Sequence, residues 1–314
     1  MKKSNYDIVI IGGGMAGLTA GLYAARAGLD TLLLEGTGVG GQALRADIVE
    51  NFPGFPGGIN GFELITRLKE QALKFGLQIE SEKALSLILE THKPKRVMLE
   101  DSSVYCLALI LALGASPKKL GIPGEEKFAG RGVSYCATCD GYFYKDRTVV
   151  VVGGGDTAVE EALFLERLCR RVFLVHRKES LRASKVLQER LFKSPKIEFI
   201  PSAEIQEISG TSKTEEVILK NNKDNTTSTL KTDGVFIFVG TKPNTDFLKG
   251  TVKLDEAGYI LTDDEMKTSQ DGVFACGDAR KRPFRQLVTA AGEGAVAAYS
   301  SSHYVLISKG IIYK

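Results

Sequence analysis

A pair of cysteines followed directly by an acid has the clearest chemistry in this sequence. Cys136 and Cys139 are separated by two residues, and Asp140 follows the second cysteine. Such a pair can open and close as a disulfide, and its spacing lowers the pKa of one thiol, which favours the nucleophilic thiolate. Asp140 is close enough along the chain to hand a proton to a leaving thiolate. The stretch therefore predicts a dithiol that exchanges with disulfides.

Two other interpretations of the pair stay open, namely half of a zinc site and a structural disulfide. A closed structural zinc site needs four ligands. The sequence has no second Cys-x-x-Cys and no His-x-x-x-His, and its three histidines have no ligand-like spacing. We therefore expect no bound metal.

The remaining cysteines stand alone in the sequence, so the five do not form a secreted disulfide framework. They are Cys106, Cys169 and Cys276. In a reducing compartment a Cys-x-x-Cys pair is more often catalytic than structural. The apolar run before Gly12 is too short for a signal peptide or a membrane span, so we expect a cytoplasmic location.

Length and composition predict an ordinary globular protein of two domains. The 314 residues exceed one comfortable hydrophobic core, and 43% hydrophobic with 25% charged residues is typical of soluble proteins. A net charge of +3 is too balanced to indicate a nucleic-acid partner.

A strand, a glycine-rich turn and a helix open the chain. Residues 6–11 predict a buried parallel strand that enters a Gly-x-Gly-x-x-Gly turn, a helix and a second strand that ends on Glu35. The turn glycines are Gly12, Gly14 and Gly17. Glycines allow a tight turn and close approach of a pyrophosphate, and the acid accepts ribose hydroxyls. This unit predicts binding of a dinucleotide such as FAD or NAD.

The same unit returns later and aligns with the first without gaps, Gly153 standing at the position of Gly12. Its turn consists of Gly153, Gly154, Gly155, Asp156, Thr157 and Ala158. The chain therefore contains two nucleotide-binding units and belongs to the α/β class.

The second unit differs from the first in the charge that follows its second strand. His176 stands at the position of Glu35 and is followed by three cations, Arg177, Lys178 and Arg182. An acid there repels a 2′-phosphate, whereas cations accept one, so the second site predicts NADP(H). A solvated basic strand end is the alternative.

The rest of the chain must complete these two units. We expect a discontinuous first domain over residues 1–117 and 248–314, with residues 118–247 inserted as the second domain. The C-terminal part predicts a short strand over 273–276, a Gly277-Asp278 turn and a long helix of small residues over 286–303. The Gly- and Pro-rich stretch 36–58 predicts either an ordered loop near a ligand, which we favour, or a flexible loop.

Taken in order, these motifs closely resemble the low-molecular-weight thioredoxin reductases over nearly the whole chain. The Cys-Ala-Thr-Cys-Asp block directly ahead of a second nucleotide-binding unit is the most specific of them. The others are Gly12-x-Gly14-x-x-Gly17, Gly40-Gly41-Gln42, Gly153-Gly-Gly-Asp-Thr-Ala158, His176-Arg177-Lys178 and Cys276-Gly277-Asp278-Ala279.

The resemblance implies FAD in the first site, with its pyrophosphate on the turn 12–17, its adenosine ribose on Glu35 and its ribityl chain on Asp278. Further FAD contacts are implied for Gly41, Gln42, Asn51, Gly277, Arg285 and Gln286. The helix that begins there would stabilise the negative charge of the reduced ring, although a plain packing helix is the alternative. NADPH is implied for the second site.

The resemblance also implies roles and partners. Cys139 would be the flavin-side thiol, and Cys136 the thiol that attacks a thioredoxin or thioredoxin-like protein. A homodimer without nucleic-acid or membrane partners is expected. Three positions depart from the family pattern, namely Leu113, Lys178 and Cys276. Lys178 attracts a 2′-phosphate but cannot bind it bidentately, and we expect Cys276 to be a buried inert thiol.

Two rival functions keep part of this assignment. One is an enzyme with the same FAD and dithiol that uses ferredoxin as donor or a small dithiol as substrate. The other is a flavin-binding redox sensor with negligible turnover. Retention of Arg177 and Arg182 argues against a lost pyridine-nucleotide site, and the acid beside the dithiol argues against the sensor.

Overall fold

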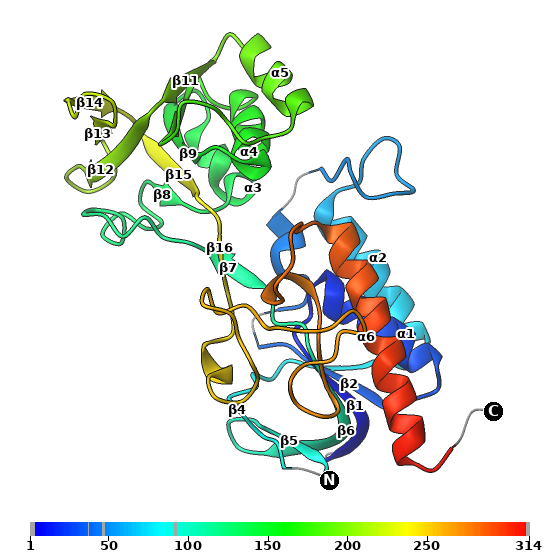
Figure 1. Cartoon of the computed structure of the whole chain (residues 1–314). Helices are drawn as coiled ribbons and strands as arrows, with labels where there is room; N and C mark the ends of the chain where they lie inside the picture. The colour runs from blue at the N-terminus through cyan, green and yellow to red at the C-terminus, as the bar shows by residue number, and fades with distance from the viewer. Residues whose placement is uncertain (1–3, 37, 46–47, 91–92, 312–314) are drawn as a thin grey trace. The chain divides into compact units, whose positions relative to one another are not determined.

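The computed structural model describes residues 4–36, 38–45, 48–90 and 93–311, with only the backbone of Arg45 and Cys139. The chain divides into two compact units (Figure 1). Unit 1 comprises Met1–Ser116 and Lys242–Lys314, and unit 2 comprises Pro117–Thr241. No helix of the described segments is long and apolar enough to cross a membrane.

Unit 1 is built on a mixed sheet in the order β3-β2-β1-β6-β5-β4, with β17 also pairing with β6. Strands β3, β2, β1, β6 and β17 pair in parallel, and β4 and β5 are antiparallel additions. The strands are β1 (Asn5–Ile11), β2 (Thr31–Leu34), β3 (Gln78–Glu80), β4 (Ser86–Ile88), β5 (Lys95–Met98), β6 (Ser103–Leu111) and β17 (Val273–Ala275).

Three long helices of unit 1 cover one face of this sheet, α1 (Met15–Arg26), α2 (Gly61–Lys74) and α6 (Leu287–Ser308). Helices α1 and α6 lie side by side (Figure 1) because small residues line both. A Cβ added to Gly294 would lie 2.3 Å from the carbonyl oxygen of Ala16, so this approach requires glycine. The central strand β1 is buried on both faces, which explains its nearly unbroken apolar sequence.

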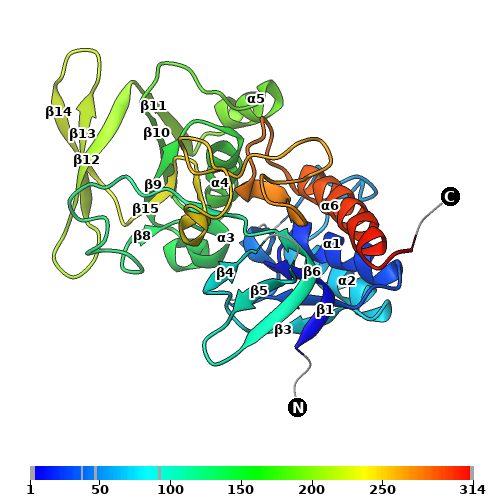
Figure 2. The same cartoon turned by 60° about the horizontal axis from the view of Figure 1, so that its bottom comes forward.

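Unit 2 repeats the arrangement with a parallel sheet in the order β11-β10-β9-β15-β8. Its elements are β8 (Val133–Ser134), α3 (Ala137–Asp140), η2 (Gly141–Tyr144), β9 (Thr148–Gly153), α4 (Asp156–Glu166), β10 (Arg171–His176), α5 (Lys185–Lys193), β11 (Ile197–Pro201) and β15 (Gly234–Phe238). A separate antiparallel sheet stands beside it (Figure 2), formed by β12 (Ala203–Ser209), β13 (Glu216–Asn221) and β14 (Thr227–Lys231).

The two nucleotide units of the sequence are thus the β1-α1-β2 and β9-α4-β10 segments, one in each compact unit. The predicted α/β class with a second unit inserted into the first is confirmed. The predicted C-terminal helix is present as α6, which continues to Ser308.

The chain returns to unit 1 earlier than the sequence predicted, at Lys242 rather than residue 248. Strand β16 (Thr241–Pro243) pairs with β7 (Ala115–Pro117), and Asn244 then bonds to unit 1. Its side chain donates to the carbonyl of Leu113 at 2.9 Å and accepts from Ser116 Oγ at 2.6 Å. These polar contacts lie in a turn without periodicity, so the sequence pattern did not mark them.

Candidate active site

Cys136 lies in a tightly bonded turn of unit 2, between β8 and α3. It is disulfide-bonded and 8% exposed. The hydroxyl of Ser134 accepts from its backbone N–H at 3.0 Å and donates to its carbonyl at 3.1 Å. The side chain of Cys139 lies outside the described part of the chain, so its pairing with Cys136 stays a prediction. These local bonds fix the backbone of Cys136 within the turn.

Asp140 ends α3, and its backbone N–H donates to the carbonyl of Cys136 at 3.2 Å. The pKa of the nearby Tyr144 is raised, first by burial and then by the charge of Asp140. The acid therefore lies beside the dithiol turn, while its predicted role as a proton donor stays a prediction.

The three other cysteines are free and buried. Burial raises the pKa of Cys106 and of Cys276 to about 12, and that of Cys169 to about 11. A thiol with such a pKa is protonated at neutral pH and does not act as a nucleophile. Cys276 is 0% exposed, which agrees with the prediction of a buried inert thiol.

The glycine-rich turn of unit 1 is tightly packed at two of its glycines and open at the third. Gly12 has φ +108°, and a Cβ on it would lie 2.2 Å from the carbonyl oxygen of Ala112. A Cβ on Gly17 would lie 1.8 Å from the carbonyl oxygen of Gly12. A Cβ on Gly14 meets nothing within 4 Å, so this side of the turn is open. Two glycines thus close the turn and the third leaves room for a ligand.

Two predicted residues lie against this turn. The carboxylate of Glu35, directly after β2, accepts the N–H of Gly13 at 2.7 Å. A Cβ on Gly41 would lie 3.3 Å from the Cα of Gly14, and the N–H of Gly40 donates to the carbonyl of Gly13 at 2.9 Å. Around Gly40 and Gly41, the long loop is therefore ordered against the glycine-rich turn.

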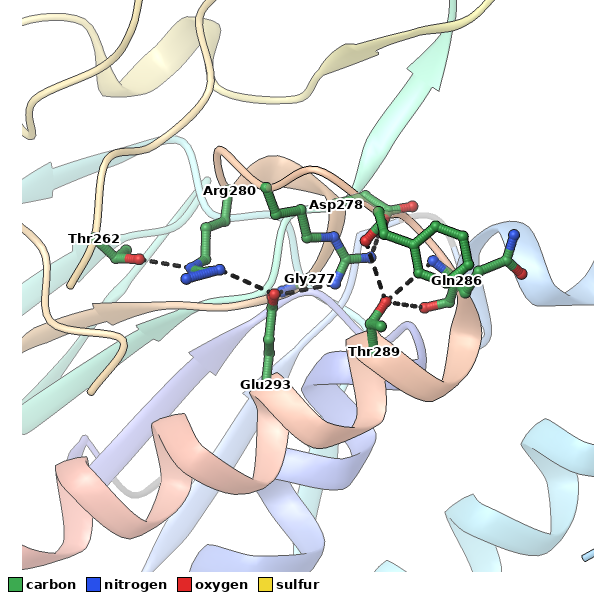
Figure 3. A network of polar contacts seen from close by, with 9 residues as sticks. Thr262, Gly277, Asp278, Arg280, Gln286, Thr289 and Glu293 are labelled. Carbon is green, nitrogen blue, oxygen red and sulfur yellow. Dashed lines mark hydrogen bonds and ion pairs between the residues drawn. The ribbon is translucent and has the colours of Figure 1, made fainter. Parts of the chain in front are cut away.

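The turn at Gly277 and Asp278, in η4 (Gly277–Ala279), approaches the start of α1. A Cβ on Gly277 would lie 2.9 Å from the Cβ of Ala16, and its N–H donates to Glu293 Oε2 at 2.8 Å. Asp278, labelled in Figure 3, forms an ion pair with Arg282. The predicted residues of this turn therefore lie beside those of the glycine-rich turn.

Glu293 is a residue that sequence reasoning missed. It binds Arg280 Nη1 at 3.0 Å and the N–H of Gly277 (Figure 3). It also pairs with Arg282 Nη1 at 3.2 Å. The side chain of Arg282 is only 2% exposed. A lone acid within a helix of small residues was the available signal, and its arginine partners lie 11 to 13 positions earlier in the sequence.

Two of the remaining predicted FAD residues, Asn51 and Gln286, meet at the start of α6. Gln286 caps this helix through a capping box with Thr289. Its side chain also accepts from Asn51 Nδ2 at 3.0 Å. Gln42 donates to the carbonyl of Ala115, and the guanidinium of Arg285 lies 4.2 Å from the ring centre of Tyr259. Asn51 and Gln286 are thereby brought together from 235 positions apart.

The second glycine-rich turn packs against His176. Gly153 has φ +153°, and a Cβ on it would lie 2.4 Å from the carbonyl oxygen of Phe238. A Cβ on Gly154 would lie 2.3 Å from the ring of His176, while one on Gly155 meets nothing within 4 Å. The turn is again closed on one side and open on the other.

Residues that follow β10 return to this turn. The N–H of Arg182 donates to the carbonyl of Gly154 at 2.6 Å, and the N–H of Ser184 donates to Asp156 Oδ1 at 2.6 Å. Thr157 and Ala158 lie in the first turn of α4. The predicted basic segment is therefore anchored next to the glycine-rich turn.

A cavity of about 430 Å³ opens at this turn within unit 2. Its lining includes His176, Arg177 and Arg182 together with two cations that sequence reasoning missed, Lys118 and Lys119. Lys178 is exposed and is not part of the lining. The missed lysines belong to the start of unit 2, far from the basic cluster in sequence, so no local pattern marked them.

The pKa of His176 is lowered by burial and then by the charges of Arg182, Arg177 and Lys178. Its Nε2 is buried and has no hydrogen-bond partner among the described residues. A neutral imidazole surrounded by cations leaves the cavity with an excess of positive charge, which suits a phosphate. No cluster of three or more His, Cys, Asp or Glu in the described segments could hold a metal ion.

The chain matches the family model of pyridine nucleotide-disulphide oxidoreductases over residues 6–294. It is 45% identical over 303 residues to a thioredoxin reductase of Treponema pallidum, covering 96% of this chain and 98% of that protein. A thioredoxin reductase of Mycolicibacterium smegmatis is 44% identical over 305 residues, with 97% and 98% covered.

Solved structures give the same result. A crystal structure of thioredoxin reductase from Lactococcus lactis superposes with a TM-score of 0.94 at 42% identity, covering 96% of this chain and 99% of that one. The match to the family model, over residues 6–294, spans both glycine-rich turns and the dithiol segment. The chain therefore belongs to the pyridine nucleotide-disulphide oxidoreductases and, within them, to the thioredoxin reductases.

Proposed function

We propose that this protein is a thioredoxin-disulfide reductase that uses NADPH as its electron donor. Membership of the pyridine nucleotide-disulphide oxidoreductases implies FAD and a nicotinamide nucleotide. The observation that supports NADPH as this nucleotide is the cation-lined cavity at the second glycine-rich turn. Relatives named thioredoxin reductase support the choice of a thioredoxin as the protein substrate.

FAD fits the residues of unit 1. The open side at Gly14 admits a pyrophosphate, the carboxylate of Glu35 lies beside the turn for the adenosine ribose, and Asp278 lies in the neighbouring turn for the ribityl chain. Bound FAD supplies a carrier that takes hydride from a nicotinamide and passes two electrons to a disulfide. The chain's own residues hold this carrier and keep its surroundings ordered.

The second site would discriminate between NADPH and NADH by charge. Arg177 and Arg182 line the cavity beside the ring of His176, where the first site has Glu35. A guanidinium binds a 2′-phosphate by charge-assisted hydrogen bonds, and a neutral histidine does not repel it as a carboxylate would. NADH has no 2′-phosphate and forgoes these contacts.

The dithiol would carry the exchange with the protein substrate. In the reduced enzyme, the Cys136 thiolate attacks one sulfur of the partner disulfide, forms a mixed disulfide and releases one partner thiolate. Cys139 then attacks the Cys136 sulfur, restores the enzyme disulfide and releases the second partner thiolate. Asp140, whose backbone bonds to Cys136, would protonate a leaving thiolate.

A homodimer and a reducing, cytoplasmic setting complete the proposal. Tyr23 of α1, Phe62 of α2 and Tyr299 of α6 are large apolar side chains that are 48%, 65% and 75% exposed. Exposed apolar surface of this kind supports association with a second copy of the chain. Free buried cysteines are compatible with a reducing compartment.

The decisive experiment crosses donors and acceptors in steady-state assays. NADPH, NADH and reduced ferredoxin are each tested with thioredoxin and with a small disulfide. The proposal predicts fast turnover only for NADPH with thioredoxin. Preference for ferredoxin, or flavin reduction by NADPH without turnover of any disulfide, would overturn it in favour of a different reductase or a redox sensor.

A further inference from the structure

A buried carboxylate in unit 2 connects two segments that the mechanism above does not relate. Glu125 is 1% exposed, although its neighbour Glu126 is exposed and pairs with Lys119. Charged side chains are rarely this buried unless their oxygens are satisfied. The carboxylate of Glu125 therefore needs hydrogen-bond donors within the protein that replace the water it loses on burial.

Three donors meet the two oxygens of Glu125. The backbone N–H of Leu120 donates to Oε1 at 2.9 Å, and that of Gly121 donates to Oε2 at 2.6 Å. The phenol of Tyr135 donates to Oε1 at 2.6 Å. Burial raises the pKa of Tyr135, and the hydrogen bond to Glu125 raises it further, so the phenol stays a donor at any physiological pH.

The third donor belongs to the residue directly before Cys136. The strand that precedes the dithiol, β8, is two residues long and pairs only through Val133 and Ser134. The strand itself thus ends before Tyr135, and the turn that follows is held by the bonds of the Ser134 hydroxyl to Cys136 and by the side-chain bond of Tyr135. Tyr135 and Leu120 both pack against the same apolar cluster. Apolar contacts therefore accompany the hydrogen bond between Tyr135 and Glu125.

We infer that Glu125 is a positioning residue for the dithiol. Its carboxylate binds the backbone N–H groups of Leu120 and Gly121 and also the phenol of Tyr135, and so it ties the residue before Cys136 to this backbone. The inference rests on the proposed role of Cys136 in disulfide exchange. Fixing the residue before Cys136 keeps the two thiols in the geometry that forms a disulfide. A dithiol held in this way has a higher effective concentration and therefore a more stable disulfide.

The test compares three single substitutions in the full-length holoenzyme. Tyr135→Phe removes only the phenol oxygen, and Glu125→Gln places an amide where two backbone N–H groups point at a carboxylate. Glu126→Gln is the matched control, because it makes the same chemical change one position away on an exposed side chain. The double variant of Glu125→Gln with Tyr135→Phe completes a thermodynamic cycle.

Each protein is equilibrated with reduced and oxidised glutathione, and its free thiols are then alkylated. Mass spectrometry measures the fraction of molecules in which Cys136 is alkylated. Two enzyme thiols lose two electrons and two protons to form one disulfide, and one glutathione disulfide becomes two glutathione thiols. We expect Tyr135→Phe and Glu125→Gln each to weaken the enzyme disulfide about tenfold, a rise of about 30 mV in reduction potential. Glu126→Gln should stay within about twofold of the original protein.

The double variant should weaken the enzyme disulfide by no more than about tenfold, since both substitutions act through the same contact between Glu125 and Tyr135. Unchanged equilibria in folded Tyr135→Phe and Glu125→Gln proteins, or a fully additive double variant, would overturn the inference. A lower thermal midpoint with an unchanged equilibrium would show a structural role only. Should Glu125→Gln fail to fold, Tyr135→Phe alone decides, because it keeps both backbone bonds to Glu125.

The outcome is separable from that of the proposed function. Thioredoxin turnover by the unsubstituted enzyme tests the function without reference to Glu125. Turnover with unchanged variant equilibria refutes the positioning role alone, whereas shifted equilibria without turnover refute the function alone.

Discussion

The β1-α1-β2 and β9-α4-β10 segments have the same strand, turn and helix, yet they present different charges to a ligand. In unit 1 the carboxylate of Glu35 accepts the N–H of Gly13 at 2.7 Å. In unit 2 the ring of His176 occupies the corresponding place against Gly154. The difference teaches that the same backbone turn can carry a different charge at the end of its second strand, which is the position that the proposal uses to distinguish the two nucleotides.

The two turns also differ in what lies over them. In unit 1 the loop at Gly40 and Gly41 and the turn at Gly277 both lie against the glycine-rich segment. In unit 2 the turn opens into a cavity of about 430 Å³. A cofactor that stays bound suits the first arrangement, and a nucleotide that must enter and leave at each cycle suits the second.

The largest effect should come from making the two turns alike. Gly17 stands where unit 2 has Ala158, but a Cβ on Gly17 would lie 1.8 Å from the carbonyl oxygen of Gly12. We expect Gly17→Ala to lower the free energy of unfolding by about 4 kcal/mol or more and to release FAD. Chemical denaturation of the FAD-free protein and flavin absorbance measure this. Gly14→Ala, at an open position, is the control for unfolding alone, because its methyl group would stand where the pyrophosphate is proposed to bind. An equal loss of unfolding free energy in the two variants would mean that the turn is more yielding than its contacts indicate.

The next effect concerns the ion pairs that brace the unit 1 site. Glu293→Gln leaves Arg282, 2% exposed, with Asp278 as its remaining acid. Removing one partner of a buried pair costs about 3 kcal/mol, so the thermal midpoint and the affinity for FAD should both fall. Glu63→Gln is the control, because its pair with Arg67 is half exposed and should contribute under about 1 kcal/mol. A similar loss of stability in both variants would mean that the ion pairs of Glu293 contribute no more than an exposed pair.

A smaller effect should separate the two nucleotides. Arg177 lines the cavity of unit 2, and a charge-assisted phosphate contact contributes roughly 1.5–3 kcal/mol. Arg177→Ala should therefore raise KM for NADPH roughly tenfold or more and change use of NADH little. Lys178→Ala, at an exposed position outside the lining, should have a weaker effect. Equal losses with NADPH and NADH would contradict the charge argument.

The smallest effect is a dependence of stability on pH. Because burial and nearby cations lower the pKa of His176, the unfolded chain binds a proton that the folded protein resists. Stability should consequently fall as pH drops through the ordinary histidine range near 6.5. His176→Gln should remove part of this loss, about 1–2 °C in thermal midpoint between pH 7 and 5.5. The exposed His303→Gln serves as the control, and an identical pH profile for His176→Gln and the original protein would refute the assignment.

Much of the fold and site followed from local patterns. A buried strand, a glycine-rich turn and a helix are adjacent in sequence, so both nucleotide units could be predicted with their glycines, and so could the contrast between Glu35 and His176. The short strand β17 and helix α6 were also predicted, because apolar and small residues mark them. The return to unit 1 was placed late, since Asn244 acts through polar bonds in an aperiodic turn.

The sequence by itself determined which residues are candidates for the chemistry, because a dithiol beside an acid and two glycine-rich turns depend on residue type and close spacing. Only the tertiary structure decided which of Glu125 and Glu126 is buried, that Glu293 joins two arginines to Gly277, and that Lys118 and Lys119 line the second site. These contacts join chain segments that are distant in sequence and share no periodic pattern of apolar residues. Their energy comes from burial and from satisfied hydrogen bonds, which exist only once the segments have packed.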